Sequence, residues 1–269
     1  MGSRLPDFLL LGAPKCGTSA LHAALATHPD LHLSDPKEPK FFLTDGAPPD
    51  TGGGPGDVPT WGEHVWRRDE YEALFADADP DQLCGESTVF YLYDRAAQRR
   101  IQAMIPDAKL IAVLRDPVER AHSNWAHLRG AGLEPEADFL RALEREPERV
   151  DAGWAHFWHY TAQGRYGEQL DHLFTLFDRD RVLLLRYAEL RDTPIWAADR
   201  VCEFLGVPTG KIGGVGRRNV RDDVAGRSAW PAPEERAAAV HRFADDIPRI
   251  EHWTGWDLSA WTAARPAGS

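Results

Sequence analysis

A loop near the start of the sequence has the residue types and spacing needed to hold a phosphate group. Residues 12–19 read G-x-x-x-x-G-T-S and follow a short apolar run at residues 8–11. A glycine turn of this kind exposes backbone N–H groups, and a helix that starts directly behind it favours an anion. Thr18 stands where the related G-x-x-x-x-G-K-[ST] loop carries its lysine, whereas Lys15 lies three residues earlier. The spacing therefore predicts an anion-binding turn whose cation is Lys15.

A second candidate for phosphate binding follows an apolar run at residues 109–114. Such a nearly continuous run predicts a buried parallel strand, and ligands of open α/β sheets bind beyond the carboxyl ends of the strands. Arg115 occupies that position, and Pro117 opens a predicted helix. On this helix Arg120 and Ser123 are neighbours at i, i+3. An arginine fork with a nearby hydroxyl suits a phosphate monoester.

Short apolar runs alternate with helical patterns along the whole chain. Strands are predicted at residues 8–11, 82–87, 109–114 and 181–185. Helices are predicted from residue 18 to about 28, at 71–75 and 94–105, from 116 onward, and at 163–177, 194–205 and the end of the chain. This alternation predicts an α/β protein, with a central parallel sheet between two helical layers. We expect one domain, residues 1–269, with a flexible Gly/Pro-rich insertion at about 45–62 and a second loop at 206–233.

Composition excludes several classes of function. The chain has 269 residues and a formal net charge of −11, which argues against general nucleic-acid binding and against attachment to an anionic membrane. No apolar run approaches the ~18–20 residues of a membrane span, and no signal peptide is recognised, so we expect a cytoplasmic protein. The three cysteines are widely spaced and odd in number, which favours free thiols and no metal site. The abundance of arginine, alanine and glycine is typical of a GC-rich, bacterial source.

Taken together, the motifs resemble those of the sulfotransferases that use 3′-phosphoadenosine 5′-phosphosulfate (PAPS). Similarity to the branch of heparan sulfate and other carbohydrate sulfotransferases, with their bacterial relatives, extends over residues 14–21, 28–42, 85–91, 115–123, 164–170 and 247–261. The resemblance implies the P-loop-like sulfotransferase fold and an O-sulfotransferase activity. Such an enzyme moves the sulfuryl group of PAPS to an acceptor hydroxyl by in-line transfer and releases adenosine 3′,5′-bisphosphate (PAP), without a metal.

The resemblance also implies roles for individual residues at the donor. The 5′-phosphosulfate would be held by the turn that contains Lys15, Cys16, Gly17, Thr18 and Ser19. Lys15 would stabilise the leaving phosphate, whereas the side chain of Cys16 is expected to pack inside the loop. The 3′-phosphate would be held by Arg115 and Ser123, with further contacts from Arg217, Arg218 and Arg227. This late arginine loop departs from the Lys-Gly-Arg pattern of the family.

On the acceptor side, Glu38 matches the general base of the family, and Lys40 stands where relatives carry His or Lys near the acceptor. The residues at 86–88 either line the site or cap the next helix. A cluster of aromatic residues either packs in the core or contacts the acceptor; it consists of Trp154, Phe157, Trp158 and Tyr160. The acceptor itself is open: a small molecule such as a natural product, a glycan or a lipid alcohol. The alternative functions are a P-loop kinase or NTPase and a non-catalytic nucleotide-binding module.

Overall fold

The computed structural model describes residues 4–49, 52–215 and 231–263, and their contacts group into two compact units. The first unit comprises residues 4–49, 63–114 and 172–215 of this described part. The second comprises residues 52–62, 115–171 and 231–263. The chain passes from the first unit to the second between Leu114 and Arg115, which are the end of one predicted motif and the start of another.

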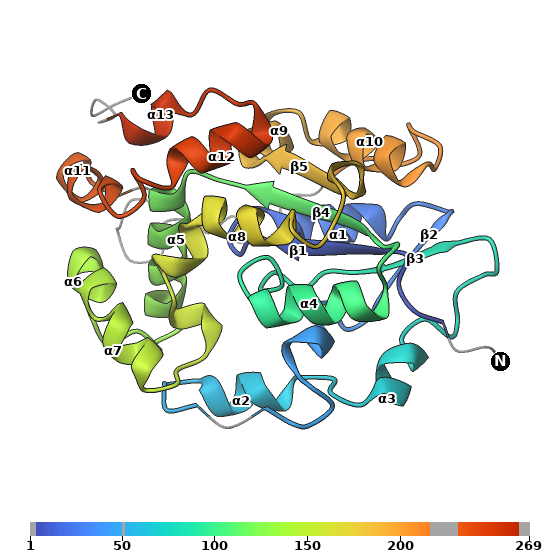
Figure 1. Cartoon of the computed structure of the whole chain (residues 1–269), viewed down its shortest axis with the longest axis horizontal. Coiled ribbons are helices and arrows are strands. Elements are labelled where there is room, and N and C mark those ends of the chain that lie inside the picture. Colours follow the sequence, from blue (N-terminus) through green and yellow to red (C-terminus); the bar gives the residue numbers. More distant parts are fainter. Residues whose placement is uncertain (1–3, 50–51, 216–230, 264–269) are drawn as a thin grey trace. The chain divides into compact units, whose positions relative to one another are not determined.

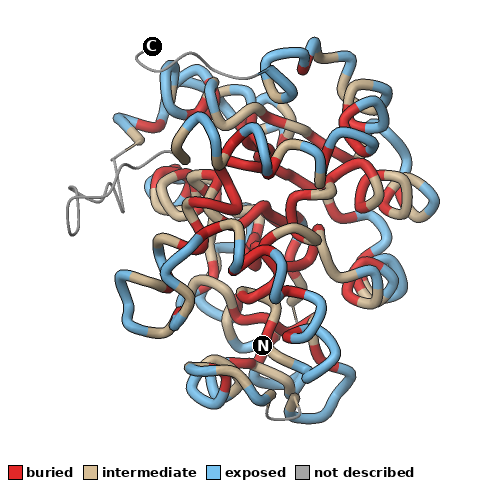
Figure 2. The backbone as a smooth tube through the Cα atoms, turned by 90° about the vertical axis from the view of Figure 1, so that its left-hand side faces the viewer, coloured by how far each residue is buried: buried red, intermediate tan, exposed pale blue. Residues whose placement is uncertain are grey.

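The first unit is built around a five-stranded parallel sheet. Its strands are β1 (Phe8–Gly12), β2 (Leu31–Leu33), β3 (Leu83–Glu86), β4 (Lys109–Leu114) and β5 (Val182–Arg186), in the spatial order β2-β3-β1-β4-β5. β1 is buried along its whole length, and β4 is buried from its second residue on, as their apolar runs require. Buried residues are red in Figure 2.

Helices cover both faces of this sheet and make the three layers predicted from the sequence (Figure 1). The helices of the first unit are α1 (Thr18–Leu25), η1 (Phe41–Leu43), α3 (Arg68–Ala73), α4 (Arg95–Met104), η4 (Arg179–Arg181), α9 (Tyr187–Asp192) and α10 (Pro194–Leu205). The connections β1–β2 and β3–β4 run across the sheet in opposite directions. Because parallel crossovers are right-handed, α1 and α4 lie on opposite faces. α10 contacts α1.

The second unit is helical within its described residues. Its helices are α2 (Asp57–Gly62), α5 (Pro117–Gly130), α6 (Phe139–Glu144), α7 (Glu146–Asp151), η2 (His156–Trp158), η3 (Ala162–Gly164), α11 (Pro233–Val240), α12 (Ile247–Thr254) and α13 (Ser259–Thr262). A further helix, α8 (Tyr166–Leu173), continues from this unit into the first. The core of the second unit contains Trp158 and Tyr160, and Trp154 and Phe157 pack against it half-buried. The aromatic cluster is therefore mainly core.

The Gly/Pro-rich insertion predicted at 45–62 contains a helix. Residues 57–62 form α2, so the expectation of a loop is wrong for this part. Asp57 is fully buried, and its carboxylate accepts hydrogen bonds from the Trp158 indole N–H and the Ala155 N–H, each at 3.0 Å. The residues just before the helix, 52–55, are all glycine or proline, so composition predicts a loop here. The contacts that stabilise α2 come from residues about 100 positions away in the chain, which local composition does not show.

Candidate functional site

The predicted phosphate turn follows β1 and is held next to β4. The Ala13 N–H donates to the Val113 carbonyl at 2.9 Å. Lys15 and Gly17 both adopt left-handed backbone conformations, with φ of 66° and 81°. A Cβ on Gly17 would lie 2.9 Å from Leu190 Cδ2, so this position needs glycine for space as well as for conformation. The turn is thus held by a hydrogen bond to β4 and by close packing against Leu190.

The side chains of this turn divide into buried and accessible groups. Cys16 is fully buried and its thiol donates to the Pro14 carbonyl at 3.5 Å, so only its backbone can face a ligand. Thr18 is also buried, whereas Lys15 and Ser19 are half-buried. Gly17 is the N-cap of α1. Lys15 and Ser19 are therefore the more accessible side chains of the turn.

Glu38 and Lys40 lie on a turn that follows β2 in the same unit. Their φ angles are 63° and 60°, a conformation that side-chain-bearing residues adopt at a cost of about 1–3 kcal/mol each. The side chain of Glu38 is 26% exposed and forms an ion pair with Lys37. The ammonium of Lys40 is buried and donates to Glu63 Oε2 at 2.6 Å. The turn thus presents one reachable carboxylate next to one shielded cation.

A second carboxyl group lies beside this turn, at the end of β3. Glu86 is fully buried and accepts hydrogen bonds from the Tyr71 hydroxyl at 3.2 Å and the Thr88 hydroxyl at 2.9 Å. Burial raises the pKa of Glu86 to about 7; its hydroxyl donors lower that pKa, and the negative charge of nearby Glu38 raises it further. The residues at 86–88 thus line the interior next to the Glu38 turn. They do not cap the next helix, because Asp94 is the N-cap of α4.

The neighbouring Ser87 connects β3 to the helix behind the phosphate turn. Its hydroxyl lies 2.8 Å from His22 Nδ1 of α1, and Ser87 itself is fully buried. Since β3 pairs with both β1 and β2, the turns that carry Lys15 and Glu38 emerge on either side of β3, at the carboxyl edge of the sheet. This edge is where open α/β sheets bind their ligands.

In the second unit, Arg115 and Ser123 lie at the start and in the middle of the α5 segment. Arg115 is 9% exposed, and its Nε donates to Glu119 Oε2 at 3.3 Å. Ser123 is half-buried, two helical turns further on. The pKa of His122 is lowered to about 4, first by burial and then by the charge of Arg115, so this imidazole is neutral at pH 7.

Arg120 does not belong to the accessible part of this motif. Its guanidinium is fully buried and donates to Gln163 Oε1 at 3.1 Å and to the Tyr160 carbonyl. It therefore holds the segment that leads into η3, and it does not supply the guanidinium expected beside Ser123. The i, i+3 spacing predicted the neighbourhood on the helix but not which arginine points inward.

Three further predictions concern the late arginine loop, a metal site and a membrane-spanning helix. Arg217, Arg218 and Arg227 lie outside the described residues. Within residues 4–49, 52–215 and 231–263, no group of three or more His, Cys, Asp or Glu side chains could hold a metal ion. Over the same part of the chain, no helix combines the length and the apolar character needed to cross a bilayer.

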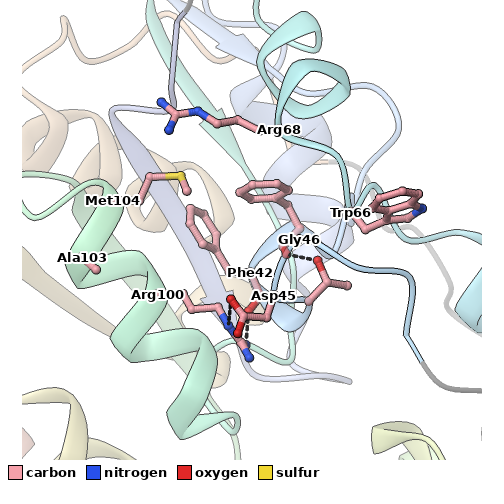
Figure 3. Close-up of a pocket in the computed structure, with 10 residues that line it drawn as sticks. Phe42, Asp45, Gly46, Trp66, Arg68, Arg100, Ala103 and Met104 are labelled. Atoms are coloured by element: carbon pink, nitrogen blue, oxygen red, sulfur yellow. Dashed lines mark hydrogen bonds and ion pairs between the residues drawn. The ribbon is translucent and has the colours of Figure 1, made fainter.

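A pocket of about 460 Å³ opens next to η1, directly after Lys40 in the chain (Figure 3). Its walls are rich in rings and apolar groups; the lining residues are Phe41, Phe42, Thr44, Asp45, Gly46, Trp66, Arg68, Arg100, Ala103 and Met104. Arg100 donates to the Phe42 carbonyl at 2.9 Å and lies 3.8 Å from Asp45 Oδ1, which ties α4 to the floor of the pocket. The pocket lies entirely within the first unit.

Fold and site together define an α/β protein with a glycine-containing turn after its first strand that carries Lys15, and comparisons with known proteins identify the family. The family profile described as "Sulfotransferase domain" matches residues 96–223. A crystal structure of a sulfotransferase from Alicyclobacillus acidocaldarius is 32% identical, with a TM-score of 0.86, and the match covers 97% of this chain and 100% of that one. The chain belongs to the family of PAPS-dependent sulfotransferases, and the predicted fold is confirmed.

Two further relatives extend the comparison. Human heparan sulfate glucosamine 3-O-sulfotransferase 6 is 31% identical over 206 residues, which make up 76% of this chain and 53% of the human enzyme. The chain thus spans about half the length of that relative. A mouse sulfotransferase, SULT7A1, complexed with PAP, shares the fold at 13% identity, with a TM-score of 0.54 over 98% of this chain and 91% of that one.

Proposed function

We propose that the protein is an enzyme that transfers the sulfuryl group of PAPS to an alcohol. The observation that carries this proposal is the pair of turns at the carboxyl edge of β1, β3 and β2, one with Lys15 and the other with Glu38 and Lys40. Membership of the sulfotransferase family supports it. Sulfuryl transfer needs charge stabilisation and positioning more than a covalent nucleophile, and these residues offer both.

The proposed reaction uses the two turns at opposite ends of the bond that breaks. The acceptor oxygen forms a bond to sulfur while the bond from sulfur to the 5′-phosphate oxygen breaks, and PAP leaves. The proton of the acceptor hydroxyl passes to the Glu38 carboxylate, the reachable carboxyl group of the site. The Lys15 ammonium and the backbone N–H groups of the turn neutralise the charge that develops on the leaving phosphate.

Arg115 and Ser123 are proposed to hold the 3′-phosphate of the same nucleotide. Chain connectivity supports this assignment. The backbone of Ala13 in the phosphate turn is hydrogen-bonded to Val113, and Arg115 follows Val113 by two residues. Two extended residues span about 7 Å at most, which is within the length of one nucleotide. Arg217, Arg218 and Arg227 remain predicted additional contacts.

Binding of PAP to the wild-type protein tests the proposal. In a thermal-shift measurement, PAP without metal should raise the melting temperature, because a ligand at 100 times its Kd stabilises by about 2.7 kcal/mol. Adenosine at the same concentration is the control. A shift with ATP–Mg²⁺ alone would instead support the kinase or NTPase alternative. Binding of PAP with no transfer from PAPS to any alcohol would support the non-catalytic module.

For the acceptor, we propose an alcohol with an apolar or ring-shaped portion. The pocket beside η1 offers ring-lined walls for such a group, as ligand pockets commonly do. A net charge of −11 disfavours a long polyanionic chain such as the one named for the human relative. Transfer of labelled sulfate should therefore be found with small phenolic, natural-product, monosaccharide or lipid alcohols. Transfer to heparan sulfate chains alone would contradict this. A cytoplasmic location and a single-domain organisation stay predictions.

A further inference from the structure

The turn that carries Glu38 and Lys40 is connected to the buried Glu86 carboxyl group through a hydroxyl. The backbone N–H of Lys40 donates to Thr88 Oγ1 at 3.1 Å. That hydroxyl donates in turn to Glu86 Oε2 at 2.9 Å. The Thr88 hydroxyl thus accepts one hydrogen bond from the turn and donates one to the carboxyl group, and it links the two.

Two further connections join the next two residues to the same carboxyl group. The Phe42 N–H donates to the Tyr91 hydroxyl at 3.2 Å, and the Tyr91 hydroxyl faces the Glu86 carboxyl group, whose pKa it lowers. The ring of Phe41 stacks on Tyr71, with 4.1 Å between ring centroids and 7° between planes, and the Tyr71 hydroxyl donates to Glu86 Oε1 at 3.2 Å. Three consecutive residues, 40–42, are therefore tied to one fully buried carboxyl group.

The turn needs such support because both Glu38 and Lys40 adopt left-handed conformations. Residues in this region keep that conformation only where the surroundings determine it. The ion pair of Lys40 with Glu63 is a weaker constraint, since the Glu63 side chain is 64% exposed and exposed pairs contribute about 0–1 kcal/mol. The buried carboxyl group, by contrast, acts on backbone N–H groups through hydroxyls that are shielded from water.

We propose that Glu86 is a positioning residue for sulfuryl transfer: it holds the turn on which Glu38 and Lys40 meet the acceptor. The role in sulfuryl transfer rests on the proposed function. The positioning of the turn rests only on the three connections described above. The groups that face the carboxyl group are the hydroxyls of Tyr71, Thr88 and Tyr91 and the carboxylate of Glu38.

Hydrogen exchange of single backbone amides tests the positioning without an acceptor. At pH 8, where Glu86 is ionised, Glu86→Gln should speed exchange of the Lys40 and Phe42 amides at least tenfold. Thr88→Val should speed exchange of the Lys40 amide alone. Tyr91→Phe should speed exchange of the Phe42 amide alone. This residue-specific pattern distinguishes loss of a connection from general loosening, and the two single-connection variants serve if Glu86→Gln fails to fold.

The matched control is Glu134→Gln, because Glu134 is another buried carboxylate, held by Arg149 and Tyr160 in the second unit. It should leave both amides as protected as in the wild type. Unchanged protection in Glu86→Gln, or equal loss in Glu134→Gln, would overturn the proposal.

Kinetics of the same variant separate positioning from donor binding. In Glu86→Gln the Kd of PAP should stay within twofold, and kcat with an alcohol found by screening should fall at least tenfold at an unchanged KM for PAPS. Glu86→Asp keeps the charge with a shorter reach and should recover part of kcat. A wild-type kcat in Glu86→Gln would overturn the proposal. If wild-type protein transfers sulfate to no alcohol, the proposed function fails, and the exchange pattern still decides whether Glu86 holds the turn.

Discussion

At the scale of single residues, the site contrasts two neighbouring carboxyl groups. Glu38 is partly exposed and paired with Lys37, whereas Glu86 is fully buried among hydroxyls and has a pKa of about 7. Different surroundings give two like groups different tasks in many active sites. Here the more accessible group is the one proposed as the base, whereas the buried one can act only through the residues that it contacts.

Glu38→Gln should lower turnover by about 10²–10⁴-fold, because the amide keeps the shape of the side chain but cannot accept the acceptor's proton. The Kd of PAP should be unchanged, as measured by calorimetry. Glu70→Gln, a substitution on the surface of α3, is the matched control and should leave both quantities as in the wild type. Turnover near the wild-type value in Glu38→Gln would reject Glu38 as the base.

The raised pKa of Glu86 predicts a pH dependence of stability with a definite sign. Its ordinary value is 4.5, so between pH 4.5 and about 7 the folded protein binds more protons at this group than the unfolded chain does. The free energy of unfolding should therefore fall as pH rises through that window, by on the order of 3 kcal/mol at 1.36 kcal/mol per pKa unit.

Chemical denaturation of the wild type and Glu86→Gln at pH 5 and pH 8 measures this contribution. The wild type should exceed the variant by more at pH 5 than at pH 8, since Gln does not titrate. The same difference at both values would show that Glu86 is not the titrating group.

At the scale of elements, the phosphate turn depends on a glycine for its shape. Gly17→Ala should weaken PAP binding at least tenfold and destabilise the protein by about 1–3 kcal/mol, because a Cβ at φ 81° would also meet Leu190 at 2.9 Å. Gly210→Ala is the matched control, with a φ of 70° and open space around the Cβ position. It should share the conformational penalty but keep the Kd of PAP. Equal Kd values in both variants would contradict the role of the turn.

The strands and helices were predictable where packing follows the local pattern. β4 and α10 begin and end at the predicted residues, because a buried parallel strand is a continuous apolar run and Pro194 marks the first turn of a helix. β2 has only three residues, which is too few for any periodicity, and it was not predicted. α2 was predicted as loop because its anchor, Asp57, has its partners in a distant segment.

The residues of the candidate site were predictable only where they belong to a recognisable sequence motif. Lys15, Glu38 and Arg115 follow from spacing and from resemblance, and their roles stay predictions. The connections of Glu86 could not be read from the sequence, since its hydroxyl partners come from α3 and from the segment after β3. The burial of Arg120 could not be read from the sequence either, because its partners lie at residues 160–163.

At the scale of the whole molecule, an acidic chain is proposed to bind a highly anionic nucleotide. With a net charge of −11 the molecule as a whole repels such a ligand, so binding must come from a few local cations. Lys15 lies in the first unit and Arg115 at the start of the second, one residue beyond Leu114 of β4. The central claim is that these two cations bind the two phosphate-bearing ends of one PAPS molecule.

Calorimetry with PAP and with adenosine 5′-phosphate, on wild type and Arg115→Ala, tests this claim most directly. Arg141→Ala, which removes a surface arginine, is the control. Loss of a charge-assisted contact of about 1.5–3 kcal/mol should weaken PAP about 10- to 100-fold. Adenosine 5′-phosphate, which lacks the 3′-phosphate, should change less than about twofold. If Arg115→Ala weakens both ligands equally, or neither, Arg115 does not bind the 3′-phosphate and the two-ended donor site is wrong.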